Sequence, residues 1–196
     1  MPTHPRPTLV GTRVYVRPPR LTDGQAFLAA TRVSRALHRP WTRPPDSRER
    51  YAAYVARFQD ADNPAHAGFL VFRREDHALV GVFNLSEIVR GAFCSAYLGY
   101  YGFAPFSGQG LMTEGMALVL DVAFRKLRLH RVEVNIQPTN TRSLALAERI
   151  GCTREGYSRR YVKIGGRWRD HERFAMLAED WQRLRRKHRA RRSPPR

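Results

Sequence analysis

The stretch SGQGLMTEGM, Ser107–Met116, places two glycines around one glutamine, immediately before a sequence of helical composition. Glycine allows backbone angles and close approaches that a side chain forbids. The start of a helix presents unpaired N–H groups and a partial positive charge. This combination favours an anion cradle, most often for phosphate. A glycine-rich loop that merely turns the chain is the simpler alternative.

The composition of the chain predicts one globular domain with a basic surface. The chain has 196 residues, a hydrophobic content of 42% and a formal net charge of +18. Such a surface attracts polyanions: nucleic acid, the ribosome or a phosphorylated cofactor. Arginines and one lysine crowd the C-terminal end. We therefore expect a single domain over residues 1–182 and a basic, disordered tail over residues 183–196.

Several classes of protein are disfavoured by the sequence. Cys94 and Cys152 lie far apart without CxxC spacing, which argues against a disulfide framework. The histidines show no HxxxH pairing, so no metal site is predicted. The N-terminus lacks the apolar segment of a signal peptide, and no apolar run approaches the roughly 20 residues that span a bilayer. These features predict a cytoplasmic protein without a membrane partner.

Apolar periodicity predicts alternating blocks of strands and helices. In chain order, the expected elements are a strand at 9–17, a helix at 22–37, a second helix carrying Tyr51 to Phe58, strands at 68–74, 78–89 and 93–103, a helix after the glycine stretch, a strand at 131–136, a helix at 141–150, and strands at 157–164 and 168–176. Asp46 and Glu49 form a capping-box pattern before the second helix. The strand–helix–strand segment 93–136 should bring its two strands together in parallel, whereas the flanking hairpins are antiparallel. The predicted fold is α/β (α+β), a mixed and mostly antiparallel sheet with helices on both faces.

The glycine stretch does not match the common nucleotide fingerprints. A G-x-G-x-x-G motif would need a third glycine where Thr113 stands, and a P-loop would need GK[ST] after its glycines. The strand before the stretch also follows an antiparallel meander, whereas the dinucleotide fingerprint belongs to a first βαβ unit.

Five stretches, one of them within the glycine stretch, carry a family resemblance. They are PWTRP (40–44), GVFNLSEIVRGAF (81–93), YLGYYGF (97–103), GQGLMTE (108–114) and the long segment from His130 to Glu172, which contains N-x-x-S, E-G-Y and W-R-D-H in order. Together with the order of elements, they resemble the GNAT acetyltransferase superfamily, and more narrowly its RimJ-type ribosomal-protein-alanine N-acetyltransferases. The resemblance covers residues from about 9 to 181 and leaves out the basic tail.

The resemblance implies acetyl-CoA as the cosubstrate and no metal. In this superfamily, backbone N–H groups of a Q/R-x-x-G-x-G/A loop hold the pyrophosphate, and here Pro105 replaces the first Gln or Arg. The residues that match the loop and the following helix start are Phe106, Ser107, Gly108, Gln109, Gly110, Leu111, Met112 and Thr113. The pantetheine arm would lie on the free backbone of Tyr100, Tyr101 and Gly102, where the strand splays from its parallel neighbour 131–136.

Amine acetylation needs a base for the amine and an acid for the leaving thiolate. The tyrosine that many GNAT members use as the acid falls at Ala147 here, so it is absent. Asn140 and Ser143 match the N-x-x-S pattern, in which the serine is proposed to bind the sulfur and the asparagine to bind cofactor or substrate. Alternatively, the two are an ordinary helix N-cap and a polar residue of the first turn.

The general base is less defined by the sequence. Glu87, at a strand end beside the expected acceptor cleft, is our candidate, although Tyr97 occupies the position where many relatives carry a glutamate. Trp41, Tyr97 and Asp170 are expected to contact the acceptor, and Asp170 could instead order its hairpin. His171 alternates to the other face of its strand and is not selected.

The resemblance therefore implies an enzyme that transfers acetyl directly from acetyl-CoA to the α-amino group of an N-terminal alanine on a ribosomal protein. The basic tail would contact ribosomal RNA through its phosphates. Two alternatives stay open: a GNAT enzyme for another amine (a small molecule, an antibiotic or a lysine), and a non-catalytic ribosome- or RNA-binding protein with this fold. An exposed hairpin edge allows either a monomer or a homodimer.

Overall fold

The computed structural model describes residues 8–39, 41–59 and 65–192. Within these ranges one eight-stranded sheet has the order β1-β2-β3-β4-β5-β6-β8-β7. The strands are β1 (Leu9–Val10), β2 (Val14–Arg17), β3 (Ala67–Arg73), β4 (Leu79–Val89), β5 (Ser95–Gly102), β6 (Arg131–Ile136), β7 (Thr153–Ile164) and β8 (Arg167–Leu177). Only β5 and β6 pair in parallel, and the other neighbours are antiparallel. The predicted mixed, mostly antiparallel sheet is confirmed.

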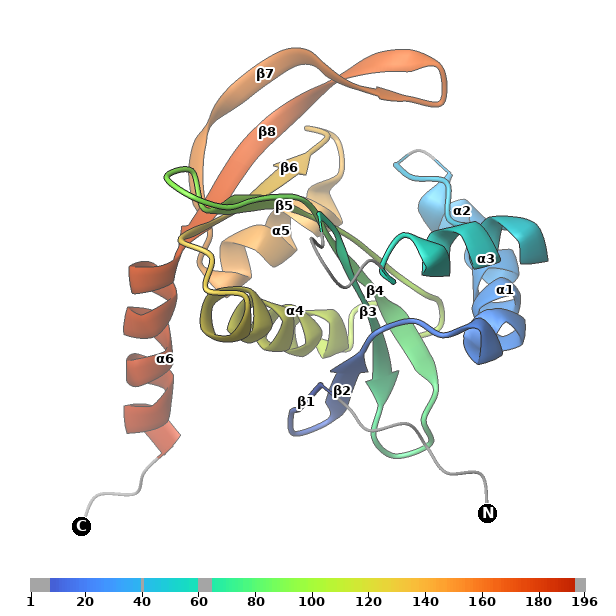
Figure 1. Cartoon of the computed structure of the whole chain (residues 1–196), viewed down its shortest axis with the longest axis horizontal. Helices are drawn as coiled ribbons and strands as arrows, with labels where there is room; N and C mark the ends of the chain where they lie inside the picture. Colours follow the sequence, from blue (N-terminus) through green and yellow to red (C-terminus); the bar gives the residue numbers. More distant parts are fainter. Residues whose placement is uncertain (1–7, 40, 60–64, 193–196) are drawn as a thin grey trace.

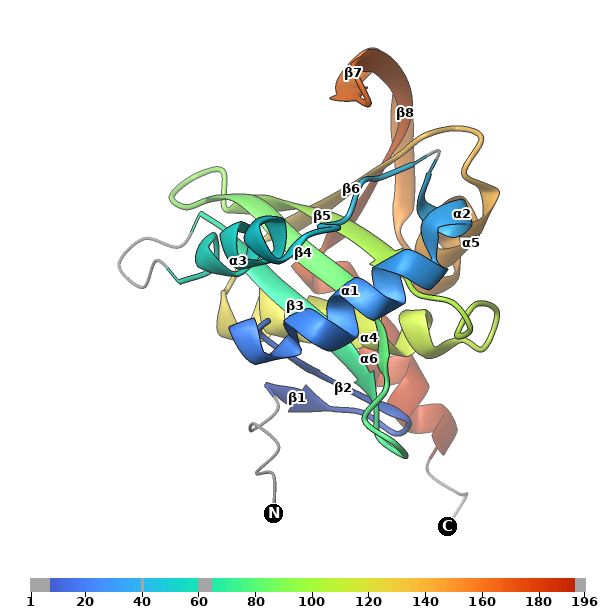
Figure 2. The same ribbon diagram turned by 90° about the vertical axis from the view of Figure 1, so that its right-hand side faces the viewer.

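Helices cover both faces of this sheet. They are the 3₁₀ turn η1 (Leu21–Asp23), α1 (Gly24–Val33), α2 (Arg35–His38), α3 (Arg48–Ala56), α4 (Leu111–Asp121), the π-helical turn η2 (Val122–Lys126), α5 (Thr141–Ile150) and α6 (Ala178–Arg192). Figure 2 shows α1 and α3 in front of the sheet, with α4 and α6 behind it. In Figure 1, β7 and β8 rise as a curved hairpin beyond the other strands.

Two apolar cores result from the alternation of side chains along the strands. On β3, Leu70 and Phe72 join the core beneath α1 and α3, whereas Phe69 and Val71 join the core beneath α4 and α5. A strand that is buried on both faces reads as a continuous apolar run, which the sequence GFLVF has.

Three local predictions need correction. The helix expected at 22–37 is divided at Ser34, whose buried hydroxyl accepts a hydrogen bond from the N–H of Ala104 at 2.9 Å. The strand expected at 9–17 is two short strands joined by a turn. The second helix is capped by Ser47, which accepts from the N–H of Arg50 at 3.3 Å, because Asp46 instead pairs with the Arg50 guanidinium.

The last helix, α6, continues to Arg192, into the segment 183–196 that the sequence analysis assigns to a basic tail. The indole N–H of Trp181 donates to Asp121 at 2.8 Å, and Leu184 lies against Gly151 at the end of α5. Trp181 and Leu184 lie three residues apart on one face of α6 and pack against the core. They hold the start of a segment whose composition alone would predict a solvated chain. No helix in the described ranges is long and apolar enough to cross a membrane.

Candidate active site

The parallel strands β5 and β6 separate along their length. They pair only at Ser95 with Arg131, Ala96 with Val132 and Tyr97 with Glu133. Beyond this point β5 continues to Gly102 beside β4, and β6 continues to Ile136 beside β8. One edge of each strand is therefore free of its neighbour, as the splayed pair predicted from the sequence requires.

A cavity of about 1210 Å³ lies at this separation. Its walls come from β5, the loop before α4, the end of β6, the start of α5 and the segment around α2. Most of the residues expected to bind cosubstrate or acceptor line it: Trp41, Tyr100, Tyr101, Gly102, Phe106, Ser107, Gly108, Gln109, Gly110, Met112, Thr113, Asn140 and Ser143. The side chain of Leu111 is instead buried in the core beneath α4.

The glycine loop has the geometry of an anion cradle. Gly108 and Gly110 have φ values of 80° and 73°, which L side chains rarely adopt. Gly110 is the N-cap of α4 without a side-chain cap, so the first N–H groups of the helix are free for a ligand. A Cβ at Gly108 would meet no other residue within 4 Å. The loop therefore fits a pyrophosphate group held by backbone donors and the helix dipole.

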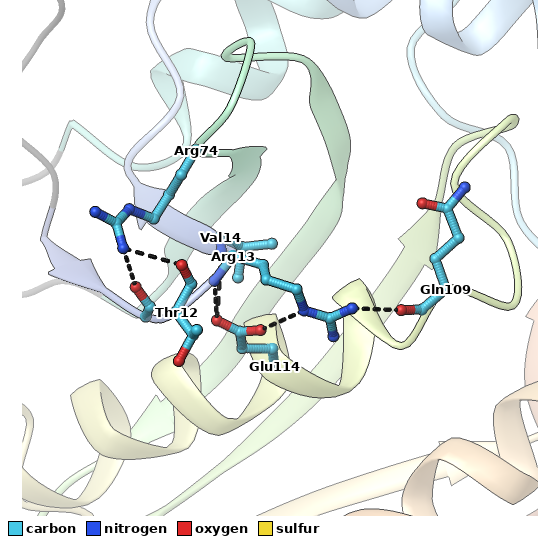
Figure 3. Close-up of polar contacts among 7 residues, drawn as sticks. Thr12, Arg13, Val14, Arg74, Gln109 and Glu114 are labelled. Carbon is cyan, nitrogen blue, oxygen red and sulfur yellow. Dashed lines mark hydrogen bonds and ion pairs between the residues drawn. The ribbon is translucent and has the colours of Figure 1, made fainter.

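A long-range contact, which we call the Arg13–Glu114 latch, holds this loop against the N-terminal strands (Figure 3). Glu114, in the first turn of α4, accepts from the backbone N–H of Arg13 at 2.7 Å and from its guanidinium at 3.2 Å. The same guanidinium donates to the carbonyl oxygen of Gln109 at 3.0 Å. Arg74 in turn holds the carbonyls of Gly11 and Thr12 at 3.0 and 2.9 Å. The cradle is thus fixed from outside the cavity.

Replacing Glu114 by alanine is expected to lower the free energy of unfolding by about 1–1.5 kcal/mol, because the hydrogen bonds to its carboxylate are lost while the exposed Arg13 guanidinium is solvated by water. Chemical denaturation followed by circular dichroism measures the change. Glu148→Ala, on the exposed face of α5, is the control and should change stability by less than about 0.5 kcal/mol. Equal losses in the two variants would contradict a role for the latch.

Ser143 and Tyr100 form a hydroxyl pair on one wall of the cavity. The Ser143 hydroxyl donates to the phenol oxygen of Tyr100 at 2.9 Å, and the phenol donates to the Ser143 carbonyl at 3.0 Å. Asn140 caps α5 by accepting from the Ser143 N–H at 3.3 Å. Burial raises the pKa of Tyr100 well above its ordinary value, so the phenol stays neutral at pH 7.

This pair places the phenol of Tyr100, from β5, beside Ser143. The sequence analysis did not consider β5 as the source of an acid for the thiolate. Ala147, the position of the family's usual tyrosine, is fully buried in the core. Tyr100 comes from β5. The sequence analysis assigned a role only to its backbone, in binding the pantetheine arm, and none to its side chain. The alternation of side chains along β5 could have predicted this position. Ala96 and Leu98, on the same face of β5 as Tyr100, belong to the core beneath α4 and α5.

Besides Leu111, three predicted residues lie outside the cavity lining. Glu87 is exposed, with φ 50°, where β4 and β5 shift register between Ser86 and Val89. The Tyr97 hydroxyl lies 3.4 Å from that of Tyr161 on β7. The Asp170 carboxylate accepts from the Tyr157 hydroxyl at 2.5 Å and from the Arg160 N–H at 2.7 Å, so it orders the hairpin.

These two hydrogen bonds have an electrostatic consequence for Asp170. The bond from the Tyr157 hydroxyl, and after it the bond from the Arg160 N–H, lower the pKa of the Asp170 carboxyl below its ordinary value.

The ionisable groups that line the cavity differ from those expected. No aspartate or glutamate of the described residues lines it, whereas His38 and His171 do. The sequence analysis selected neither histidine. Across residues 8–39, 41–59 and 65–192, no three His, Cys, Asp or Glu side chains gather in a way that could hold a metal ion.

Comparison with known proteins gives a consistent assignment. Residues 13–153 match the family described as acetyltransferase (GNAT) domain. The probable N-acetyltransferase YjcK of Bacillus subtilis (strain 168) is 36% identical over 180 residues, which are 88% of this chain and 98% of that protein. The [ribosomal protein uS5]-alanine N-acetyltransferase of Escherichia coli (strain K12) is 38% identical over 113 residues, 58% of each chain.

A solved structure shares both the fold and a measurable sequence similarity. The structure of Mycobacterium smegmatis RimJ in complex with CoA-disulfide superposes with a TM-score of 0.79 at 27% identity, covering 90% of each chain.

Proposed function

The chain belongs to the GNAT acetyltransferase family and is an acetyl-CoA-dependent N-acetyltransferase, and we propose that it acetylates the α-amino group of the N-terminal alanine of a ribosomal protein. The observation that carries this proposal is the 38% identity with an enzyme named for the alanine of ribosomal protein uS5. Because that identity covers 58% of the chain, the acceptor needs a direct test.

The character of the cavity supports a peptide N-terminus over a polyamine. A polyamine carries several positive charges, and burying them requires carboxylates close by. None of the described acidic residues lines this cavity, and the whole chain carries a net charge of +18. A single α-ammonium group, which can lose its proton near neutral pH, suits these surroundings better.

The contacts of the site suggest a role for each of its parts. The N–H groups at the start of α4 and the loop around Gly108 would hold the pyrophosphate, and the free backbone of Tyr100 to Gly102 would hold the pantetheine arm. The Ser143–Tyr100 pair would face the sulfur, and the Ser143 hydroxyl would turn from the Tyr100 oxygen to donate its one hydrogen bond to the departing thiolate. Trp41 would form one wall of the acceptor site, and Tyr97 and Asp170 would contact the peptide beyond its first residue.

Intact-mass spectrometry of a peptide panel tests the acceptor. Peptides that begin with Ala, Ser or Met are incubated with the protein and acetyl-CoA, each also with a blocked α-amino group and a free lysine; spermidine is assayed in parallel. One acetyl added only to the free Ala N-terminus supports the proposal. Acetylation of blocked lysine peptides or of spermidine moves the acceptor. If no acceptor is acetylated, binding of acetyl-CoA would favour another small-molecule acceptor, and lack of binding would favour a non-catalytic role.

We also propose that the end of α6 contacts ribosomal RNA. Arg186 and Lys187 are exposed and make no ion pair within the described residues, whereas Arg183 and Arg185 pair with Asp180 and Asp121. Removing residues 183–196 would also remove Leu184 from its contact with α5, so substitution is the better test.

The double variant Arg186→Gln/Lys187→Gln is expected to weaken co-sedimentation with ribosomes. The slope of log affinity against log salt should fall by about 1 for each phosphate that the variant no longer binds. The matched control Arg48→Gln/Arg57→Gln removes the same charge from exposed positions in and beside α3. If both double variants reduce the slope equally, the charge of the whole surface rather than α6 is responsible.

A further inference from the structure

Direct acetyl transfer needs a group that takes a proton from the acceptor. An α-ammonium group has a pKa near 7.7–8.0, so most of it is protonated at pH 7. Carboxylates are the usual alternative to histidine for this task. No described carboxylate lines the cavity, and Glu87 is exposed outside it. The two imidazoles, His38 and His171, are therefore the candidates.

Neither ring nitrogen of His38 is available to an acceptor amine. Its Nε2 lies 2.7 Å from the carbonyl oxygen of Gly102, and since a carbonyl can only accept, Nε2 carries the proton. The remaining nitrogen, Nδ1, is buried without a hydrogen-bond partner among the described residues. The ring packs edge-on against Tyr101 and Phe103 at centroid distances of 5.2 and 5.5 Å. His38 therefore positions the end of β5 and has no lone pair directed at an acceptor.

His171 has the opposite arrangement. Its Nδ1 lies 3.0 Å from the carbonyl oxygen of Arg169, so Nδ1–H is the donor and the lone pair is on Nε2. The side chain is 4% exposed and lines the cavity. Burial lowers its pKa below the ordinary value, with opposing contributions from the Arg169 carbonyl and Asp170, so the ring is neutral at pH 7.

The face of the sheet on which His171 lies is the acceptor side. Phe174 and Met176 of β8 belong to the core beneath α4 and α5, so His171 lies on the other face by alternation. On β5, Tyr100 contacts Ser143 of α5, whereas the next residue, Tyr101, contacts His38 of α2. The cavity thus crosses the separated strands, with Ser143 on one face and His171 on the face toward α2.

We propose that His171 is the general base that takes a proton from the acceptor amine through its Nε2 atom. The proposal rests on the acetyl transfer proposed above. The ammonium group gives one proton to Nε2, and its freed lone pair forms the N–C bond to the acetyl carbonyl carbon as the C–S bond breaks. The thiolate then takes up the second proton that the nitrogen loses, and His171 returns its proton to solvent.

The pH dependence of the reaction tests this role, with His171→Gln as the variant. The titratable groups that act on the ring are Tyr161 of β7, at a centroid distance of 5.8 Å, and Asp170 of its own strand. The wild type should lose kcat/KM only below pH 6.5, where Nε2 becomes protonated. His171→Gln must use amine that is already neutral, so its activity should fall below about pH 8. At pH 6.5 we expect kcat to fall about 100-fold with little change in KM, and the difference should shrink above pH 8.

Three further measurements distinguish a base from a structural residue. Long-range ¹H–¹⁵N spectra of the protein without acetyl-CoA should show a His171 ring protonated at Nδ1, and a ring protonated at Nε2 would overturn the proposal. Calorimetry should show unchanged acetyl-CoA binding by His171→Gln. Added imidazole should restore activity to His171→Ala, which also covers the case in which the glutamine variant folds poorly.

His130→Gln, at an exposed position outside the cavity lining, is the control and should keep the wild-type pH profile. If the wild type acetylates a peptide and His171→Gln keeps the same profile, His171 is not the base. If the wild type acetylates none of the peptides, the acceptor proposal fails, and the spectra still test the state of His171 independently.

Discussion

Replacing Asp23 by alanine is expected to lower the free energy of unfolding by about 3–5 kcal/mol, because it leaves a buried guanidinium without its counterion. The Arg17 guanidinium meets the Asp23 carboxylate through two hydrogen bonds of 2.8 and 2.5 Å, and the two side chains are only 6% and 11% exposed. The guanidinium also lies 4.3 Å above the ring of Phe72. The pair joins β2 to the start of α1, so its loss also loosens the wall of the second core.

The chain supplies its own control for this prediction. Asp46 and Arg50 form an ion pair of similar length, 2.7 Å, but their side chains are 52% and 71% exposed. Asp46→Ala should therefore cost about 0.3–0.5 kcal/mol. Urea denaturation monitored by circular dichroism compares the two variants, and the melting temperature of Asp23→Ala should fall by roughly 10 °C. Similar losses in both variants would show that burial does not decide the strength of the Arg17–Asp23 pair.

Gly108→Val is expected to weaken acetyl-CoA binding about 100-fold or more. A valine at φ 80° is strained, and its side chain would project into the space that the pyrophosphate needs. Each backbone N–H bond to a charged group that is lost contributes about 1.5–3 kcal/mol, so the loss of two such bonds gives about 100-fold or more. Isothermal titration calorimetry with acetyl-CoA measures the dissociation constant.

A valine elsewhere separates this effect from backbone strain. Gly91, in the turn between β4 and β5, has φ 69° and likewise no residue within 4 Å of its added Cβ. Gly91→Val should therefore lose stability to a similar degree as Gly108→Val but keep its affinity for acetyl-CoA. A Gly108 variant that binds acetyl-CoA normally would contradict the assignment of the loop as a pyrophosphate cradle.

The parts of the fold that the sequence predicted best depend on local signals. The strand 131–136 alternates cleanly, and the helix 141–150 lies between Asn140 as its N-cap and Gly151 as its C-cap, so both were found with the observed bounds. The glycine loop was likewise recognisable, because the glycines that allow positive φ values come directly before residues of helical composition.

The parts that were missed depend on which segments meet in space. The break at Ser34 is made by Ala104, seventy positions along the chain. Glu87 was the predicted base, but it is exposed at the register shift in β4 and does not line the cavity. His171 was set aside because of its strand face, whereas in the structure it lines the cavity on β8, the neighbour of β6. No window of sequence contains the register that decides these points.

The Arg13–Glu114 latch has a consequence for the order in which the molecule assembles. Its two ends are 101 residues apart in the chain, whereas the hairpins from β3 to β5 close over short turns. Closing a long loop costs more entropy than closing a short one, so the meander should form first. During synthesis, Arg13 leaves the ribosome well before Glu114 has been translated. We therefore expect the glycine loop to acquire its outer support late, after the sheet that carries it already exists.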